Sequence, residues 1–164
     1  HQQEGRRAGT ENVPGVLSMI AALEDRESAI AAGGHGRREA WRDQFVAEML
    51  RSLCGSRLVG EGGPRLWNTV SLVMPEFDCR QRWVVRVDKA GFAVSTGSAC
   101  ASGSEEPSHV LLAMGFQPAE AGRVLRFSSG WETAEADWQQ LAAALCGIHE
   151  TWKSSPKTNA MTTP

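Results

Sequence analysis

A cysteine inside a segment rich in glycine and serine is the first candidate for chemistry. Residues 95–106 read STGSACASGSEE, and Cys100 lies between a predicted strand and a predicted short helix. A thiol on such a loop is accessible and able to move, as a nucleophilic thiolate must be if it is to reach a target and then pass a group on. The alternative is a linker that happens to contain a cysteine, because the sequence shows no nearby group that would lower the pKa of the thiol.

Two arginine-bearing segments are candidates for binding anions. Arg126 interrupts the apolar run Val-Leu-Arg-Phe, and a strand arginine between buried neighbours must pair with an acid or face a cleft. Its forked guanidinium suits a carboxylate, and the alternative is an arginine on the solvent face of a one-sided sheet. Near the start of the chain, Arg6, Arg7 and Thr10 form a cluster that either meets a phosphate or is a solvated basic loop.

Composition is that of an ordinary globular protein. The 164 residues are 41% hydrophobic and 22% charged, with a net charge of −2, which argues against disorder, nucleic-acid binding and membrane binding. The four cysteines and four histidines lack the spacing of zinc modules, so no local metal site is expected. With no signal peptide, free thiols indicate a reducing cytoplasm. Cys54 and Cys146 fall near apolar ends of predicted helices and should react slowly.

Helices and short strands must position these residues. The segment 78–90 suits a helix or a strand, and we favour the helix because Lys89-Ala-Gly91 is typical of a helix exit. Thr133 is expected to cap the last helix. The order of elements is not a strict alternation, so we predict a two-layer α+β domain with helices covering one face of a sheet. The expected helices are 13–32, 37–53, 78–90, 107–115 and 134–153, and the expected strands are 57–59, 68–74, 92–94 and 124–127.

Several segments together carry a resemblance to a known family. They are GRRAGTEN at 5–12, NTVS at 68–71, DKAGFAVSTG at 88–97, STGSACASGSEEPSHVL at 95–111 and RFSSG at 126–130. In this order they resemble the cysteine desulfurase family, in its NifS/IscS-like branch within the class V aminotransferase superfamily. The resemblance covers about residues 5–150. It implies the fold of the small C-terminal domain of fold-type I pyridoxal-phosphate-dependent transferases.

The resemblance also implies an activity and a set of site residues. Such enzymes use pyridoxal 5'-phosphate to take sulfur from L-cysteine, leaving L-alanine and a persulfide on a loop cysteine, which by position is Cys100. By the same matching, Arg126 holds the substrate carboxylate, and Thr10, with Arg7 beside it, contacts the cofactor phosphate of the other subunit of a homodimer. The sulfur passes to an iron–sulfur scaffold or another acceptor protein. A cytoplasmic location is implied, with no nucleic-acid or membrane partner.

The chain departs from the family in its length and its lysines. Members of the family are more than twice as long, and their large N-terminal domain carries the cofactor lysine. The three lysines here are Lys89, Lys153 and Lys157, and none has the family's Ser/His/Lys setting. Trp131-Glu132 also replaces a commoner Arg-Phe. We therefore expect the isolated chain to be inactive.

More than one function remains open for such a chain. The first is a fragment or split half of a cysteine desulfurase, in which 1–12 lead in from a missing large domain, 13–153 form the small domain and 154–164 a flexible tail. The second is a free-standing module that is not an enzyme and carries a persulfide or only dimerises. A selenocysteine lyase-like protein is a third, disfavoured by the long loop around Cys100. A Ser/His/Lys motif in a continuous reading frame upstream of His1 would favour the first.

Overall fold

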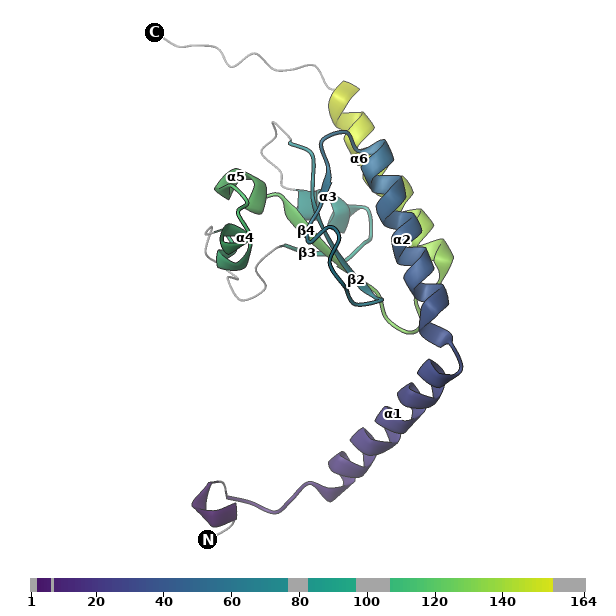
Figure 1. Ribbon diagram of the computed structural model, residues 1–164, viewed down its shortest axis with the longest axis vertical. Helices are drawn as coiled ribbons and strands as arrows, with labels where there is room; N and C mark the ends of the chain where they lie inside the picture. The colour runs from purple at the N-terminus through teal and green to yellow at the C-terminus, as the bar shows by residue number, and fades with distance from the viewer. Residues whose placement is uncertain (1–2, 7, 77–82, 97–106, 155–164) are drawn as a thin grey trace. The chain divides into compact units, whose positions relative to one another are not determined.

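The computed structural model describes residues 3–6, 8–76, 83–96 and 107–154. The chain forms two compact units, residues 1–37 and 38–164, which are described separately. Figure 1 labels the helices and strands. Within the described ranges, no helix is both long enough and apolar enough to cross a membrane.

The first unit contains a short 3-10 turn, Gln3–Gly5, and the helix α1, Val13–Ala31. Asn12 caps α1, because its side-chain oxygen accepts a hydrogen bond from the Gly15 N–H at 3.1 Å. Pro14 stands in the first turn, where no backbone donor is needed. The predicted helix is confirmed, but it buries no residue. Its large apolar side chains are exposed: Val13, Val16, Leu17, Met19, Ile20, Leu23 and Ile30.

The second unit is built on a four-stranded antiparallel sheet with the order β1-β2-β4-β3. The two long strands, β2 and β4, pair along their whole length, from Thr69 opposite Ser128 to Val73 opposite Val124. A strand late in the sequence therefore lies at the centre of the sheet (Figure 1). The strands are β1 Arg57–Leu58, β2 Thr69–Val73, β3 Ser95–Thr96 and β4 Val124–Ser128.

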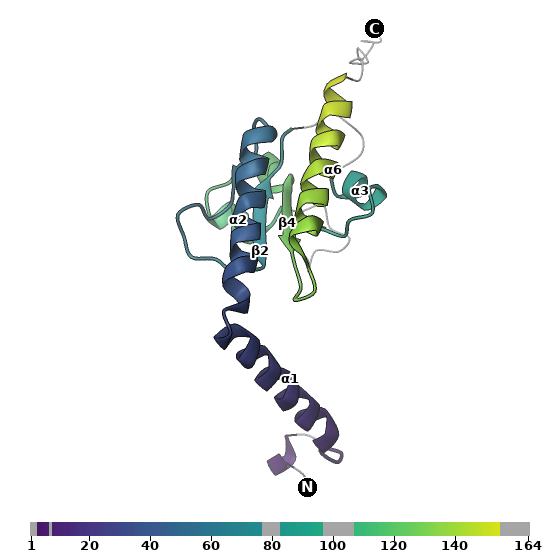
Figure 2. The ribbon, with the colours of Figure 1, turned by 90° about the vertical axis from the view of Figure 1, so that its right-hand side faces the viewer.

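Two long helices cover one face of this sheet. α2 and α6 lie side by side across β2 and β4 (Figure 2), and α3 packs against α6. The short helices α4 and α5 lie on the other side of the sheet (Figure 1). The predicted α+β fold is confirmed, but short helices lie against the second sheet face as well as the two long helices on the first. The helices are α2 Gly34–Ser52, α3 Trp83–Lys89, α4 His109–Ala113, α5 Pro118–Ala121 and α6 Glu135–Ser154.

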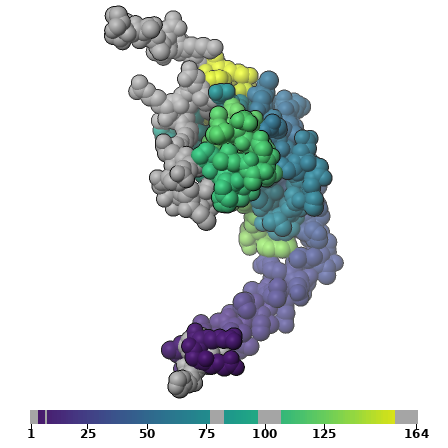
Figure 3. Space-filling model, turned by 60° about the vertical axis from the view of Figure 1, so that its left-hand side comes forward, coloured from purple at the N-terminus to yellow at the C-terminus, as the bar shows by residue number. Residues whose placement is uncertain are grey.

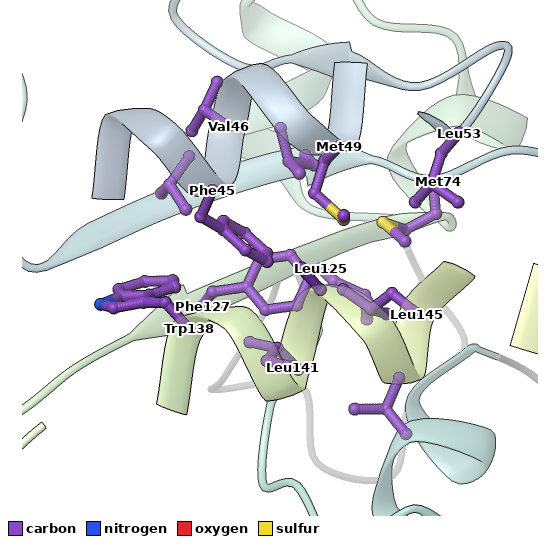
Figure 4. Packing of buried hydrophobic residues seen from close by; sticks show 14 of the residues in the cluster. Phe45, Val46, Met49, Leu53, Met74, Leu125, Phe127, Trp138, Leu141 and Leu145 are labelled. Atoms are coloured by element: carbon purple, nitrogen blue, oxygen red, sulfur yellow. The ribbon is translucent and has the colours of Figure 1, made fainter. Parts of the chain in front are cut away.

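The main core lies between the sheet and the pair α2 and α6 (Figure 4). The ring centre of Phe45 is 5.2 Å from that of Phe127 and 4.9 Å from that of Trp138, so one aromatic side chain joins both helices to β4. Side chains alternate along a strand, so Leu125 and Phe127 point into this core while their neighbours point away. A smaller apolar cluster on the opposite face contains Val73, Leu111, Ala121 and Val124.

The start of α6 differs from the prediction. The helix begins at Glu135, and the Asp137 carboxylate accepts a hydrogen bond from the Ala134 N–H at 2.8 Å. The Thr133 hydroxyl instead accepts from the Gly130 N–H at 3.0 Å. Thr133 therefore closes the turn before the helix, and an acid in the first turn accepts from the N–H of the residue that precedes the helix.

The position of one strand and the buried side chain near the end of the last helix also differ from the prediction. The strand expected at 92–94 is displaced to Ser95–Thr96, which pairs with β4, while Phe92 and Val94 are half-buried against the main core. Near the end of α6, the buried side chain is His149, which is only 3% exposed. The neighbouring Ile148, which apolar helical spacing would place in the buried stripe of this helix, is half-buried. Pairing with β4 sets the position of the strand, and packing at the end of α6 sets which side chain is buried.

Candidate functional site

The face of the sheet away from α2 and α6 carries a polar row centred on Arg126. In the two ladders, Arg126 of β4 stands opposite Ser71 of β2 and opposite Ser95 of β3. Residues directly opposite one another in an antiparallel sheet project from the same face. The three side chains therefore form one row across three strands, on the face opposite the main core. We refer to Ser71, Arg126 and Ser95 as the arginine row.

Arg126 is half-buried, and no described side chain lies within hydrogen-bonding or ion-pairing distance of its guanidinium. Acids at the adjacent end of the sheet already have partners. Glu120 accepts a hydrogen bond from Arg57 at 3.0 Å, and Glu76 pairs with Arg123 at 3.5 Å. Among the described residues the guanidinium of Arg126 therefore has no acidic partner, and its forked shape is one that matches a carboxylate.

Glu120 is fixed as an anion by its surroundings. The Gln117 backbone N–H donates to its carboxylate at 3.0 Å, and this bond, helped by the charge of Arg57, holds the pKa of Glu120 below its ordinary value. Arg57 also lies over the ring of Phe116, with the guanidinium carbon 4.7 Å from the ring centre. These contacts attach α5 and the loop before it to β1, as the adjoining green and blue surfaces in Figure 3 show.

Both ends of the segment that carries Cys100 meet the face of the arginine row. On the N-terminal side, β3 places Ser95 opposite Arg126. On the C-terminal side, α4 contributes Leu111 to the apolar cluster with Val124 on that same face. The described residues on either side of the Cys100 segment therefore contact this face, Ser95 opposite Arg126 and Leu111 in the cluster with Val124.

Of the other predicted site residues, some lie outside the described ranges and the rest are exposed. Cys100 and Arg7 lie outside the described residues, and both stay predictions. Thr10 is exposed and belongs to the first unit, whereas Arg126 belongs to the second. His109 is the exposed first residue of α4.

Comparison with known proteins decides the family. The chain matches the model of class-V aminotransferases over residues 1–141. It belongs to the class-V aminotransferase family. Curated proteins named cysteine desulfurase are similar to it: one from Gluconacetobacter diazotrophicus is 38% identical over 90% of the chain, and one from Cereibacter sphaeroides is 42% identical over 81%. The resemblance noted in the sequence is confirmed.

The chain corresponds to a part of these relatives. It spans 36% of the length of the Gluconacetobacter protein and 33% of that from Cereibacter. Two solved structures have the same fold. A NifS-like protein aligns with a TM-score of 0.72 at 24% identity, over 92% of this chain and 37% of its own. A NifS-like protein from Rickettsia africae aligns with a TM-score of 0.73 at 22% identity, over 91% of this chain and 38% of its own.

The family implies pyridoxal 5'-phosphate, and the described residues do not by themselves fit its covalent attachment. Lys89 is exposed at the end of α3, and Lys153 is exposed in the last turn of α6. Neither amine has the enclosed setting that a cofactor lysine needs. Among the described residues there is also no group of three histidines, cysteines or acids that would hold a metal ion.

Sequence reasoning missed Ser71 and Ser95. Each lies in a segment that was noted for other reasons, the strand before Pro75 and the start of the Cys100 segment. Their position beside Arg126 follows from the register, which puts both opposite it. A local signal was present, because alternation in Val-Ser-Leu turns Ser71 away from the core, but the partner across the sheet is set by long-range pairing.

Proposed function

We propose that this chain is the small, C-terminal part of a cysteine desulfurase, in which Arg126 binds the carboxylate of L-cysteine and Cys100 takes its sulfur. In the net reaction, L-cysteine becomes L-alanine and the Cys100 thiol becomes a persulfide. The observation that carries the proposal is the half-buried Arg126, which has no partner among the described side chains and stands beside two serines. The names of the relatives support the choice of reaction.

Arginine suits the carboxylate role for a geometric reason. Its planar fork donates two parallel hydrogen bonds to the two carboxylate oxygens, which fixes the orientation of the substrate as well as its position. The central strand of a paired sheet is a rigid support for this group. Because Leu125 and Phe127 on either side are buried, the backbone that carries Arg126 cannot shift without disturbing the core.

The length of chain between Ser95 and Cys100 supports the role of the thiol. Five extended residues span at most about 17 Å, so Cys100 is tethered within that distance of the residue opposite Arg126. This tether is short enough for the thiol to meet a substrate held at Arg126. It also leaves enough chain for the persulfide to be presented to an acceptor protein, such as an iron–sulfur scaffold.

The remaining parts of the proposal concern the rest of the enzyme. Pyridoxal phosphate, held by a lysine outside this chain, supplies the electron withdrawal that weakens bonds at the substrate α-carbon. Thr10, with Arg7, contributes a phosphate contact to the partner subunit of a homodimer. The exposed apolar side chains of α1 support an assembly larger than this chain. We place the enzyme in the cytoplasm.

The test uses the protein encoded by the continuous reading frame that contains this chain, loaded with pyridoxal phosphate and given L-cysteine. We expect L-alanine and, with a thiol reductant, sulfide in equal amounts. Cys100→Ser should abolish sulfide release, while Cys54→Ser, which removes an exposed thiol, leaves it unchanged. Arg126→Lys should raise KM by about tenfold or more, since a point charge cannot replace the fork.

Two outcomes would contradict the proposal. Sulfide release that survives Cys100→Ser would remove the thiol assignment, and an unchanged KM in Arg126→Lys would remove the carboxylate assignment. If the reading frame instead starts at this chain and its product forms no L-alanine from L-cysteine, the free-standing persulfide carrier or dimerisation module is favoured.

A further inference from the structure

We propose that Ser71 and Ser95 are specificity-determining residues, whose hydroxyls donate hydrogen bonds to the carboxylate that Arg126 binds. This inference rests on the proposed function and extends its carboxylate site from one side chain to three. It is argued from the register of the sheet, the hydrogen-bonding needs of a carboxylate and the other groups on the same face.

The register places both hydroxyls beside the guanidinium. Ser71 on β2 and Ser95 on β3 flank Arg126 on β4, and all three are half-buried. Directly opposite residues have their Cβ atoms roughly 5 Å apart. Arg126 is half-buried, so part of its side chain is covered on this face, and we infer that an anion at its fork comes within reach of the short side chains of its own row.

A carboxylate needs more donors than one guanidinium edge supplies. Its two oxygens offer about four acceptor sites, and the fork of Arg126 fills two of them. The backbone cannot supply the rest, because the strands β2 and β4 pair with one another along their whole length. Neither Ser71 nor Ser95 has a side-chain hydrogen-bond partner among the described residues. As far as the described residues are concerned, each hydroxyl therefore has a hydrogen atom to donate.

The other side chains of this face are less suited to the role. The Thr69 and Ser128 hydroxyls are 3.4 Å apart and contact one another, two residues along the strands from the arginine row. On the other side of the row, Val73 and Val124 belong to the apolar cluster. The site thus has hydroxyl donors in the arginine row itself and an apolar wall beside it, which favours a small molecule with one carboxylate.

The test compares threonine with valine at each serine, because these two residues have the same shape and differ by the hydroxyl. Both are β-branched and favoured in strands, so neither change should unfold the sheet. The ¹⁵N-labelled 164-residue chain is titrated with L-alanine, and the Arg126 Nε–H signal is followed by NMR, with Arg126→Lys to assign the signal. L-Alaninamide, which lacks the carboxylate, is the matched probe.

We expect L-alanine to shift the Arg126 signal in a saturable way and L-alaninamide to leave it in place. Ser71→Val and Ser95→Val should each weaken binding about fivefold or more, as the loss of a hydrogen bond to a charged group does. Ser71→Thr and Ser95→Thr should stay within about twofold of the unaltered chain. Ser128→Val, on the same strand and face, is the control and should not change the affinity.

Each contrary result has a distinct meaning. If the threonine and valine variants bind L-alanine equally, the hydroxyls do not donate to the ligand and the inference is wrong, while the role of Arg126 stands. If the unaltered chain shows no saturable shift of the Arg126 signal, the carboxylate site itself is wrong, and the proposed function loses the observation that carries it.

Discussion

The guanidinium of Arg38 lies over the ring of Trp131, with its central carbon 4.8 Å from the ring centre, and donates a hydrogen bond to the Trp131 carbonyl. The ring centre of Trp67 is 5.0 Å from that of Trp131. These contacts join the first turns of α2 to the turn that follows β4. Trp131, which departs from the commoner family pattern, therefore fixes the end of the strand that carries Arg126.

Removing Arg38 should destabilise the second unit. Arg38→Ala loses a cation–π contact and a hydrogen bond between groups that are half-buried, so we expect the free energy of unfolding to fall by about 1–2 kcal/mol. Urea unfolding followed by tryptophan fluorescence measures this change. Arg37→Ala, which removes an exposed neighbour, should change stability by less than about 0.5 kcal/mol. Equal losses in the two variants would show that the Arg38–Trp131 contact does not stabilise the fold.

His149 should make stability depend on pH in mildly acidic solution. Burial, helped by the charge of Lys153, lowers the pKa of His149 from its ordinary 6.5. The unfolded chain therefore takes up a proton near pH 6.5 that the folded chain resists, and the free energy of unfolding should fall between about pH 7.5 and pH 5.5. Glu48 and Glu120, whose pKa values are lowered from 4.5, add to the loss only at more acidic pH.

The measurement is urea unfolding at the two ends of that pH range. His149→Phe keeps a ring between Trp83 and Trp152 but cannot be protonated, so the pH-dependent loss should shrink. His109→Gln, at an exposed position on α4, should retain the full loss. A loss in His149→Phe as large as in the unaltered chain would assign the pH dependence to other groups.

The described thiols should differ in reactivity. Cys54 is exposed, which removes the reason for expecting it to react slowly. Cys146 is half-buried, and burial, with the negative charges of Glu48 and Glu150, raises the pKa of its thiol. Because the thiolate is the reactive form, iodoacetamide near neutral pH should label Cys54 well before Cys146.

Peptide mapping by mass spectrometry after brief alkylation gives the order of labelling. In urea the two rates should converge, because unfolding removes the burial that raises the pKa of Cys146. Labelling of Cys146 before Cys54 in the folded chain would contradict the burial argument. The same map tests the prediction that Cys100 reacts most readily. Cys54, which is exposed, is the control thiol for that comparison.

Elements with strong local signals were predicted correctly from the sequence. Asn12 and Pro14 mark the start of α1, and apolar spacing indicates α2 and α6 to within a few residues. β4 was recognised from its apolar run, and Arg126 stood out as the polar residue inside it. In each case the decisive interaction lies within a few residues of chain, so it is visible without the fold.

Features set by contacts across the sheet were not predictable in the same way. The position of β3 depends on pairing with β4, and the serines beside Arg126 are known only once that register is known. Thr133 and Asp137 are both plausible caps, and the turn at Gly130 decides between them. The helix α1 was predicted, but the exposure of its apolar side chains shows that helical periodicity does not say what covers an apolar face.

The 164-residue chain by itself should not retain pyridoxal phosphate or release sulfide from L-cysteine. Lys89 and Lys153 are exposed at helix ends, where nothing orients the cofactor ring or keeps water from a bond to the amine. The Thr10 hydroxyl is also exposed, and one neutral hydrogen bond contributes about 1 kcal/mol net, which is too little to hold the phosphate.

The visible absorbance of the chain after incubation with the cofactor and desalting measures how much cofactor is retained, and a sulfide assay is run on the same sample. Serum albumin, which carries many exposed lysines, is the control for loose attachment. Cofactor absorbance retained well above that control, together with cysteine-dependent sulfide, would show that residues 1–164 already form a complete site.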